Sequence, residues 1–353
     1  MDKIKRLLSM LRPDADALLI TSEKNQYYMT GFDYTDGYVL ITREKSYLLT
    51  DFRYIEAAKE ECAPGYTVMT MKGTRKDMFS QLLCENHVKT LAFEENAVSY
   101  SAKLSFDKIF EGFTLVPSEN VLGRMRIVKD ADEIDKMIKA QRIAEAALDH
   151  VLGFITPDKT EVDVALELEF YMRSHGAKST SFDTIAVSGS ASSRPHGVPR
   201  PVKLEKGFLT MDFGALYKGY CSDMTRTVVL GECTGEMRKV YDTVLEAQLA
   251  ALDAYAVGKT GREIDKVARD IIYAAGYEGC FGHGLGHGVG MDIHEAPGVS
   301  AGSDTPFEKG HVVTCEPGIY LEGRYGVRIE DMVVFGEDGP YDITLAPKNL
   351  IIL

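Results

Sequence analysis

The sequence lacks two features that are typical of proteins that bind nucleic acids or membranes. It has no basic excess: 53 Asp and Glu outnumber 40 Lys and Arg, which gives a formal net charge of −13 at pH 7. Basic patches supply most of the attraction to nucleic acid and to anionic lipid. No apolar run approaches the roughly 18 residues that a membrane-spanning helix needs. Neither a nucleic acid nor a membrane is therefore expected as a partner.

Cysteine is scarce, and its spacing suggests no pairing. None of the six cysteines forms a C-x-x-C motif, and a chain of 353 residues does not need a disulfide scaffold. Reduced thiols fit a cytoplasmic protein best. The N-terminal stretch has some basic character, but its apolar part ends at Arg12 and is too short for the apolar region of a secretory signal. Cys221 and Cys315 are expected to fill the core, because the carboxylates near them favour a harder metal than thiolates do.

Phosphate-binding motifs are missing as well. The glycine-rich run from Gly282 to Gly290 fails the G-x-G-x-x-G spacing, and no Gly-Lys-Ser/Thr follows it. His283 and His287 are four residues apart, but the glycines between them disfavour a zinc-binding helix. The run therefore predicts neither a nucleotide loop nor a helical zinc motif.

The patterns that are present divide the chain near residue 120. Before that point strand-like and helix-like runs alternate, which predicts an α/β N-terminal domain over residues 1–122. A long amphipathic run then extends from Asp130 to Phe154, with Asp130 as N-cap and Glu133 in the capping-box position. Residues 123–353 are predicted to form a second, α+β domain. The strands expected in the first domain are 17–21, 38–42, 47–50, 68–71 and 91–94, and the helices are 52–62 and 76–87.

The second domain contains a weak internal repeat. Residues 160–165, TEVDVA, are similar to residues 262–268, REIDKVA, and each segment begins a helix that ends near a glycine. A long helix precedes each of them, and strands follow. This order of elements predicts two similar halves with the site in the cleft between them.

Each half carries a pair of carboxylates on a predicted hairpin. If the first hairpin pivots near Tyr217 and Lys218, Asp212 and Asp223 face each other with Cβ atoms about 5 Å apart. Like charges in that position destabilise a sheet unless a cation lies between them.

The second hairpin and the glycine-rich run complete the candidate site. Glu316 and Glu330 lie seven residues on either side of Gly323, so a hairpin pivoting there opposes them as well. Asp331 should face the other side of its strand. With one histidine, these four carboxylates make a hard-ligand site that suits manganese, cobalt or iron better than thiolate-type zinc, and they balance the charge of two divalent cations.

These residues resemble the metallopeptidases of the pita-bread fold: aminopeptidase P (Xaa-Pro aminopeptidase), Xaa-Pro dipeptidase (prolidase) and, more distantly, methionine aminopeptidase. The resemblance covers the whole chain. It implies a creatinase-like N-terminal α/β domain over 1–122 and a pita-bread (creatinase/aminopeptidase) catalytic domain over 123–353 with a pseudo-twofold repeat. It also implies five metal ligands: Asp212, Asp223, His287, Glu316 and Glu330. Of these, Asp223 and Glu330 would be the bridging carboxylates.

The resemblance implies roles for four further residues. His294 would steady the tetrahedral intermediate, His283 would be a further cleft histidine, and His196 would bind substrate and shuttle protons. Arg328 matches a cleft arginine of the proline-specific members, although it could instead simply pair with a nearby acid.

The implied activity is hydrolysis of the bond between an N-terminal residue and proline in a small peptide. Two divalent metal ions, with manganese favoured over cobalt, zinc and iron, would share a water, lower its pKa and generate a bridging hydroxide. Glu316 would receive the proton. The family also implies a homodimer.

Several alternatives stay open. Aminopeptidase P and Xaa-Pro dipeptidase differ in cleft walls that the sequence does not locate, and methionine aminopeptidase does not need this N-terminal domain. A metal-free creatinase-like C–N hydrolase departs from the five-ligand set, which this chain retains in full. A non-catalytic peptide-binding module would be expected to have lost ligands.

Overall fold

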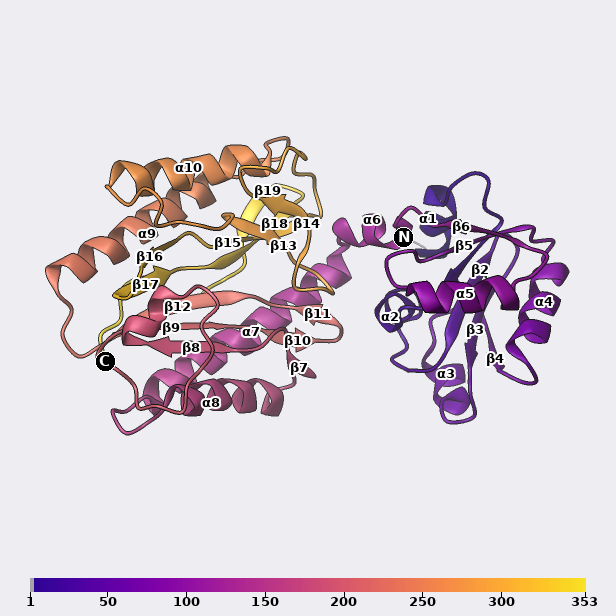
Figure 1. The fold of residues 1–353 in the computed structure, drawn as a ribbon, viewed down its shortest axis with the longest axis horizontal. Helices are drawn as coiled ribbons and strands as arrows, with labels where there is room; N and C mark the ends of the chain where they lie inside the picture. The colour runs from indigo at the N-terminus through magenta and orange to yellow at the C-terminus, as the bar shows by residue number, and fades with distance from the viewer. Residues whose placement is uncertain (1–2) are drawn as a thin grey trace. The chain divides into compact units, whose positions relative to one another are not determined.

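The computed structural model describes residues 3–353 and contains two compact units, the first ending at Met125 and the second spanning Arg126–Leu353 (Figure 1). The predicted boundary after residue 122 lies inside α6 (Val121–Ile127). Within the described residues, no helix has both the length and the apolarity to cross a membrane.

The first unit is built on one six-stranded sheet with the order β4-β3-β2-β1-β5-β6. Strands β2 and β3 pair antiparallel, with Ile41 opposite Ser46, and form a hairpin around residues 43–45. The expected strands and helices are all present within a few residues. The bounds are α1 (Lys3–Met10), β1 (Ala17–Ile20), α2 (Glu23–Thr30), β2 (Tyr38–Thr42), β3 (Ser46–Thr50), α3 (Ile55–Glu61), β4 (Tyr66–Thr70), α4 (Arg75–Glu85), β5 (Thr90–Phe93), α5 (Tyr100–Ile109) and β6 (Thr114–Pro117).

The second unit confirms the predicted repeat. Each half begins with a long helix and a shorter one: α7 (Ala131–Phe154) and α8 (Glu161–Ser174), then α9 (Gly235–Ala254) and α10 (Gly261–Ala274). The shorter helices both start with a capping box, formed by Thr160 with Asp163 and by Thr260 with Glu263. The two cap threonines also form equivalent antiparallel bridges, to Lys203 and to Pro306. The capping box predicted at the start of α7 is present too.

Strands follow each helix pair. The first half contributes the sheets β11-β10-β7 and β12-β9-β8, and the second contributes β14-β13-β15-β18-β19 and the ribbon β16-β17. The strand bounds are β7 (Ser179–Thr180), β8 (Ile185–Ser188), β9 (Gly207–Phe213), β10 (Ala215–Tyr217), β11 (Tyr220–Cys221), β12 (Met224–Leu230), β13 (Gly286–Gly288), β14 (Glu295–Val299), β15 (Val312–Cys315), β16 (Gly318–Leu321), β17 (Tyr325–Arg328), β18 (Asp331–Gly336) and β19 (Gly339–Asp342).

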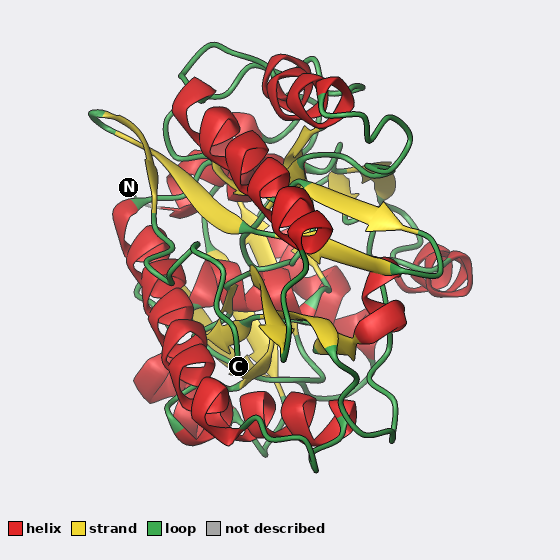
Figure 2. Ribbon diagram, turned by 90° about the vertical axis from the view of Figure 1, so that its left-hand side faces the viewer, coloured by secondary structure: helices red, strands yellow, loops and turns green. Residues whose placement is uncertain are grey.

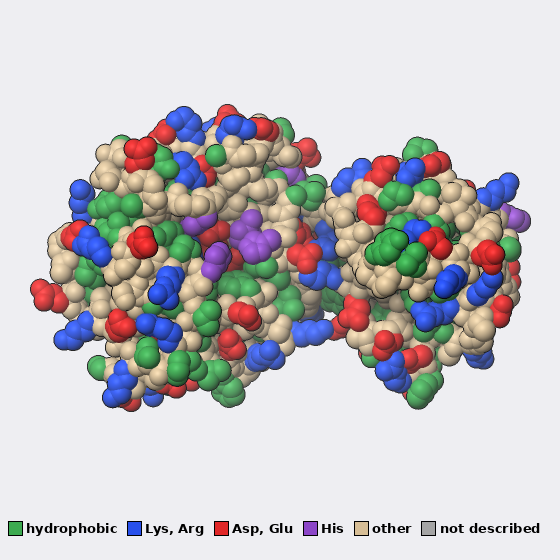
Figure 3. Space-filling model, in the orientation of Figure 1, with side chains coloured by type: hydrophobic (Ala, Val, Ile, Leu, Met, Phe, Trp, Pro, Cys, Tyr) green, Lys and Arg blue, Asp and Glu red, His purple; other side chains and the backbone are tan. Residues whose placement is uncertain are grey.

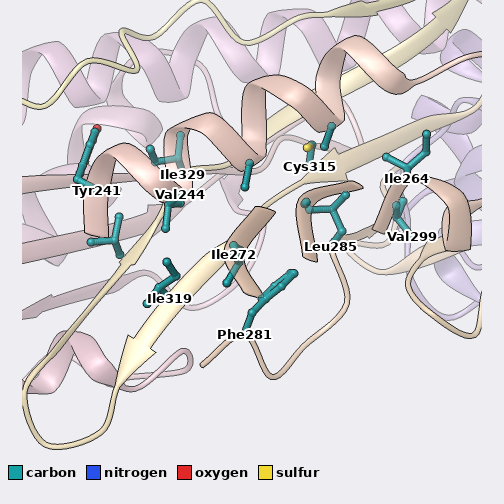
Figure 4. Close-up of a cluster of buried hydrophobic side chains, with 14 of the residues drawn as sticks. Tyr241, Val244, Ile264, Ile272, Phe281, Leu285, Val299, Cys315, Ile319 and Ile329 are labelled. Atoms are coloured by element: carbon teal, nitrogen blue, oxygen red, sulfur yellow. The ribbon is translucent and has the colours of Figure 1, made fainter. Parts of the chain in front are cut away.

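Two hydrophobic cores hold these strands against their helices. In Figure 1 the strands lie between α7 and α8 on one side and α9 and α10 on the other, and Figure 2 shows the same helices and strands from the side. One core packs α7 and α8 on Met211 and Val228. The other packs α9 and α10 on Val313 and Ile319, and Figure 4 shows part of it. Each buried aliphatic side chain contributes roughly 1.5–3 kcal/mol, so the helices fix the outer faces of the strands and leave the inner faces for the site.

Candidate metal centre

The hairpin with the two aspartates turns one residue later than predicted. Tyr217 pairs with Tyr220, which leaves Lys218 and Gly219 as a two-residue turn. Both have positive φ, 46° and 81°, the geometry of the tight hairpin turns that favour glycine. Asp212 therefore lies opposite Thr225. The prediction that the two aspartates oppose each other directly is wrong, because the turn chemistry moves the pivot.

The aspartates nevertheless share one face of the hairpin. The register makes Asp223 a diagonal neighbour of Asp212, and such neighbours lie on the same face about 7–8 Å apart. Gly214 allows the chain to approach closely here, because a Cβ at this position would lie 1.9 Å from the Ser222 carbonyl oxygen. Both carboxylates face the same cavity.

The hairpin with the two glutamates has the predicted register. Gly318 pairs with Arg328 and Leu321 with Tyr325, so the hairpin pivots at Gly323. Cys315 pairs with Asp331 in β15 and β18 in the same register. Glu316 and Glu330, which lie between these pairs, therefore face each other as expected.

His287 lies between the two hairpins on β13. Its Nδ1–H donates to the Gly288 carbonyl oxygen at 3.1 Å, which leaves Nε2 as the potential ligand atom. This Nε2 is 3.5 Å from Asp223 Oδ2 and 3.3 Å from Glu316 Oε1. Asp223, His287 and Glu330 each offer a ligand atom within 4.8 Å of the others.

All nine residues predicted from the sequence line one cavity of about 500 Å³. Figure 3 shows histidine side chains gathered in a hollow on this face of the second unit. The set comprises the five predicted ligands and four further residues: Asp212, Asp223, His287, Glu316 and Glu330, with His196, His283, His294 and Arg328.

The electrostatics of the carboxylates fit divalent cations. Burial, and then the charges of neighbouring carboxylates, raise the pKa values of Asp223 and Glu330. Burial also raises the pKa of Asp212 against the opposing charge of Arg328. For Glu316 burial is outweighed by the hydrogen bond and charge of His287, which lower the pKa to about 2. Within the described residues, Asp212 Oδ1 is buried without a hydrogen-bond partner. Hard cations would relieve this repulsion and use that free oxygen.

Arg328 is held by its neighbours inside the cavity wall. Its Nη2 donates to Asp212 Oδ2 at 2.5 Å and its Nε to Thr225 Oγ1 at 3.0 Å. Its Nη1 donates to the Tyr320 hydroxyl at 2.9 Å and to the Pro195 carbonyl at 3.2 Å. The arginine thus pairs with a nearby acid, the alternative left open by the sequence, while it also lines the cavity.

The other three histidines differ in their hydrogen bonding and burial. His283 donates from Nδ1 to the Gly284 carbonyl at 2.8 Å, and its Nε2 lies 2.9 Å from the Tyr320 hydroxyl. The His294 ring lies 4.3 Å from the His287 ring, and burial, followed by His287, lowers its pKa. His196 is exposed on the loop between residues 193 and 207.

Two sequence predictions about neighbouring residues are confirmed. Asp331 is fully buried and points away from the cavity to Arg226 and Lys348, each at 2.8 Å. Cys221 and Cys315 are buried free cysteines that do not line the cavity.

Sequence reasoning missed the hydroxyl groups that fix the carboxylates. The Thr225 hydroxyl donates to Glu330 Oε2 at 2.6 Å, and the Thr314 hydroxyl donates to Glu316 Oε1 at 3.1 Å. The correct hairpin register would have identified Thr225 as the neighbour of Asp212. Apolar residues also line the cavity, among them Phe182 and Ile293, and no motif in the sequence indicated that they belong to the site.

Comparison with known proteins extends over both units. A model of metallopeptidase family M24 matches residues 135–337, and one of the creatinase/prolidase N-terminal domain matches residues 3–128. The chain is 43% identical over 354 residues to the peptidase YqhT of Bacillus subtilis (strain 168), covering 100% of this chain and 99% of that protein. A solved structure of an Xaa-Pro dipeptidase from Bacillus anthracis has a TM-score of 0.95 at 43% identity and covers 100% of this chain and 99% of its own. An X-Pro aminopeptidase structure from Thermotoga maritima MSB8 gives 0.94 at 37%, with 100% of both chains covered.

Proposed function

The chain belongs to metallopeptidase family M24 and carries a creatinase/prolidase N-terminal domain, and on this premise we propose that it is a dinuclear-metal exopeptidase that hydrolyses the bond between an N-terminal residue and proline. The family match confirms the resemblance drawn from the sequence, including the pita-bread fold. The observation that carries the proposal is the convergence of four carboxylates and His287 on one cavity.

The five predicted ligands would hold two divalent cations, and we propose manganese. Asp223 and Glu330 would hold both ions, as the family resemblance implies, and burial, followed by the charges of neighbouring carboxylates, raises their pKa values. Asp212 has a free buried oxygen, and His287 presents Nε2 towards the carboxylates. When bound, the cations would supply Lewis acidity that acidifies a shared water and polarises the scissile carbonyl.

The protein's own groups would then position and move protons. Glu316 would accept a proton from the attacking water, a role that requires an ionised carboxylate and is consistent with its lowered pKa. Within residues 3–353 the His294 ring has no hydrogen-bond partner, so it is available to stabilise the developing oxyanion. His283 would hold Tyr320, which in turn contacts Arg328, and Arg328 would keep Asp212 in place. His196, at the exposed edge, would contact the substrate and exchange protons with solvent.

Substrate length separates the two activities that fit this site. A dipeptidase must recognise the free carboxylate that follows proline, whereas an aminopeptidase P must leave room for a longer chain. The solved relatives carry both names. The test is cleavage by the manganese-loaded protein, resolved by mass spectrometry, of Ala-Pro, Ala-Pro-Ala, Arg-Pro-Pro and Met-Ala-Ser.

Each cleavage pattern identifies one activity. Cleavage of Ala-Pro alone would mean a dipeptidase, and cleavage of the longer proline peptides would mean an aminopeptidase P. Removal of Met would favour methionine aminopeptidase. No cleavage despite bound metal would overturn the proposal in favour of a non-peptide substrate or a peptide-binding role.

We also propose that the protein is a cytoplasmic homodimer. The compartment is supported by six free cysteines, which suit a reducing environment. The homodimer rests on the family resemblance alone. Sedimentation velocity on the purified protein tests it, with the mass of two 39.1 kDa chains as the expected result and that of one chain as the contrary result.

A further inference from the structure

Two buried cations lie beside the loop that carries His294. Arg126 is in the last turn of α6, and Lys129 lies in the short segment before α7. Their side chains are 9% and 1% exposed. Buried Lys and Arg side chains are rare unless they are paired, so their partners indicate what they do.

The shared partner is Glu295, whose side chain is only 7% exposed. Arg126 Nη2 donates to Glu295 Oε1, and Lys129 Nζ lies 3.3 Å from Glu295 Oε2. Glu295 Oε1 also accepts the backbone N–H of Asp292 at 3.0 Å, which closes the turn that contains His294. Arg126 contacts the Asp292 carboxylate as well. Both ends of the turn are therefore fixed to buried cations.

The same turn is fixed from the side of the metal centre. The N–H of Cys221, two residues before Asp223, donates to the Gly290 carbonyl at 2.8 Å. Glu295 pairs with Gly288 across β13 and β14, one residue from His287. Gly290 lies against the cluster so closely that a Cβ there would be 2.4 Å from Glu295 Oε2. The turn therefore has little freedom, and His294 stays beside His287.

Stability alone does not explain such a cluster. Replacing buried ion pairs by apolar residues is often neutral or stabilising, so a buried pair is weak evidence for stability. Charged hydrogen bonds are directional and hold groups in defined positions. The residue placed by this cluster is His294, which lines the cavity while its neighbour Glu295 is buried behind it.

We propose that Arg126 and Lys129, acting through Glu295, are positioning residues that hold the His294 imidazole beside His287 for catalysis. The proposal rests on the peptidase function proposed above. None of the three residues lines the cavity, so their effect on turnover must pass through His294.

The first test is a double-mutant cycle with Glu295→Gln and His294→Ala. Glu295→Gln is expected to lower kcat about tenfold or more, as loss of an outer hydrogen-bonding partner does, with metal content kept and KM changed less than about twofold. In the His294→Ala background the same substitution should cost almost nothing further. The matched control is Glu145→Gln, which breaks an ion pair with Arg142 on α7 away from the cavity and should leave kcat unchanged.

A second test does not depend on turnover. In metal-free protein labelled with ¹³C at histidine Cε1, the His294 signal is identified by its loss in His294→Ala. We expect Glu295→Gln and Arg126→Gln to shift or broaden it, Arg126→Lys to restore it in part, and Glu145→Gln to leave it in place. If Glu295→Gln does not fold, Lys129→Met serves in its place.

The outcomes separate this inference from the proposed function. Equal losses of kcat in the two backgrounds, or an unmoved His294 signal, would overturn the positioning role while proline-peptide cleavage by the wild type still stands. A wild type that cleaves no proline peptide would overturn the proposed function, and the histidine signal would then still decide whether the cluster places His294.

Discussion

The two hairpins that supply the carboxylates reach the same cavity by different geometry. The glutamate hairpin opposes its two acids directly about Gly323, whereas the aspartate hairpin staggers its acids diagonally across a turn at Lys218 and Gly219. Arg328, from the glutamate hairpin, bonds to Asp212 of the other. Thr225, from the aspartate hairpin, bonds to Glu330 of the other.

This exchange of hydrogen bonds shows how two unequal hairpins form one site. Each hairpin is fixed by a residue from its counterpart, so neither pair of acids is placed by its own ladder alone. The pKa values also shift in opposite directions: His287 lowers that of Glu316 despite its burial, whereas burial and then neighbouring carboxylates raise those of Asp223 and Glu330. The difference predicts which substitutions should disturb both hairpins and which only one.

The largest effect is expected from Asp223→Asn. This change removes a proposed anionic ligand, so metal affinity and activity should fall together, by more than the roughly 10–100-fold that loss of an outer partner costs. Metal content by mass spectrometry and kcat/KM would be measured on the same preparation. A variant with full metal and full activity would remove Asp223 from the bridging role.

A smaller effect is expected from Arg328→Met, which breaks the bond from the glutamate hairpin to the aspartate hairpin. Asp212 would lose its cationic partner, and activity should fall roughly 10–100-fold. The control is Arg142→Met, which removes a partly buried ion pair with Glu145 outside the cavity and should cost stability more than it costs turnover. Equal losses of kcat in the two variants would argue against a specific role for the Arg328 bond.

The hydrogen bonds of the Thr225 and Thr314 hydroxyls allow the effects of smaller changes at the two glutamates to be compared. Thr225→Val removes a bond to Glu330 and one from Arg328, whereas Thr314→Val removes a bond to Glu316 and one from the backbone N–H of His287. The first variant should lose roughly tenfold in activity and the second less, because Glu316 retains His287. The kcat/KM values of the two variants, measured at saturating metal, show which variant loses more activity. A greater loss in Thr314→Val would reverse the proposed order.

The smallest effect is expected at the turns. Gly219 and Gly323 have φ of 81° and 68°, which cost a residue with a Cβ about 1–2 kcal/mol. Gly219→Ala and Gly323→Ala should each lower the free energy of unfolding by about that amount, measured by urea denaturation, with metal stoichiometry preserved. A change in stoichiometry in only one variant would show that its turn sets the site as well as the stability.

The sequence predicts the parts of this site that rest on local chemistry. The α7 capping box, the α7 boundaries and the symmetry about Gly323 all follow from residues close together in the chain. The aspartate register was missed by one residue because Gly219 was not read as the second turn position. Helix α2 was missed because its apolar spacing is weak and its start depends on a Ser22 cap. Glu94, which follows β5 and is distant in sequence, binds both Ser22 and Asn25.

Contacts between residues far apart in the chain could not be predicted from sequence patterns. Arg126 and Glu295 are 169 residues apart, and nothing in either segment indicates that they meet. The same holds for Thr225 with Glu330, which are 105 residues apart. Family resemblance identified residues that line the cavity, but apart from Arg328, which bonds to Asp212, it did not identify the groups that hold them.

Both hairpins together are proposed to hold two divalent cations. Anomalous X-ray scattering from crystals grown with manganese would reveal these ions. We expect two anomalous peaks in the cavity, each in contact with carboxylates from both hairpins and one of them with His287 Nε2. A single peak contacted by only one hairpin, or no peak in the cavity, would contradict this proposal.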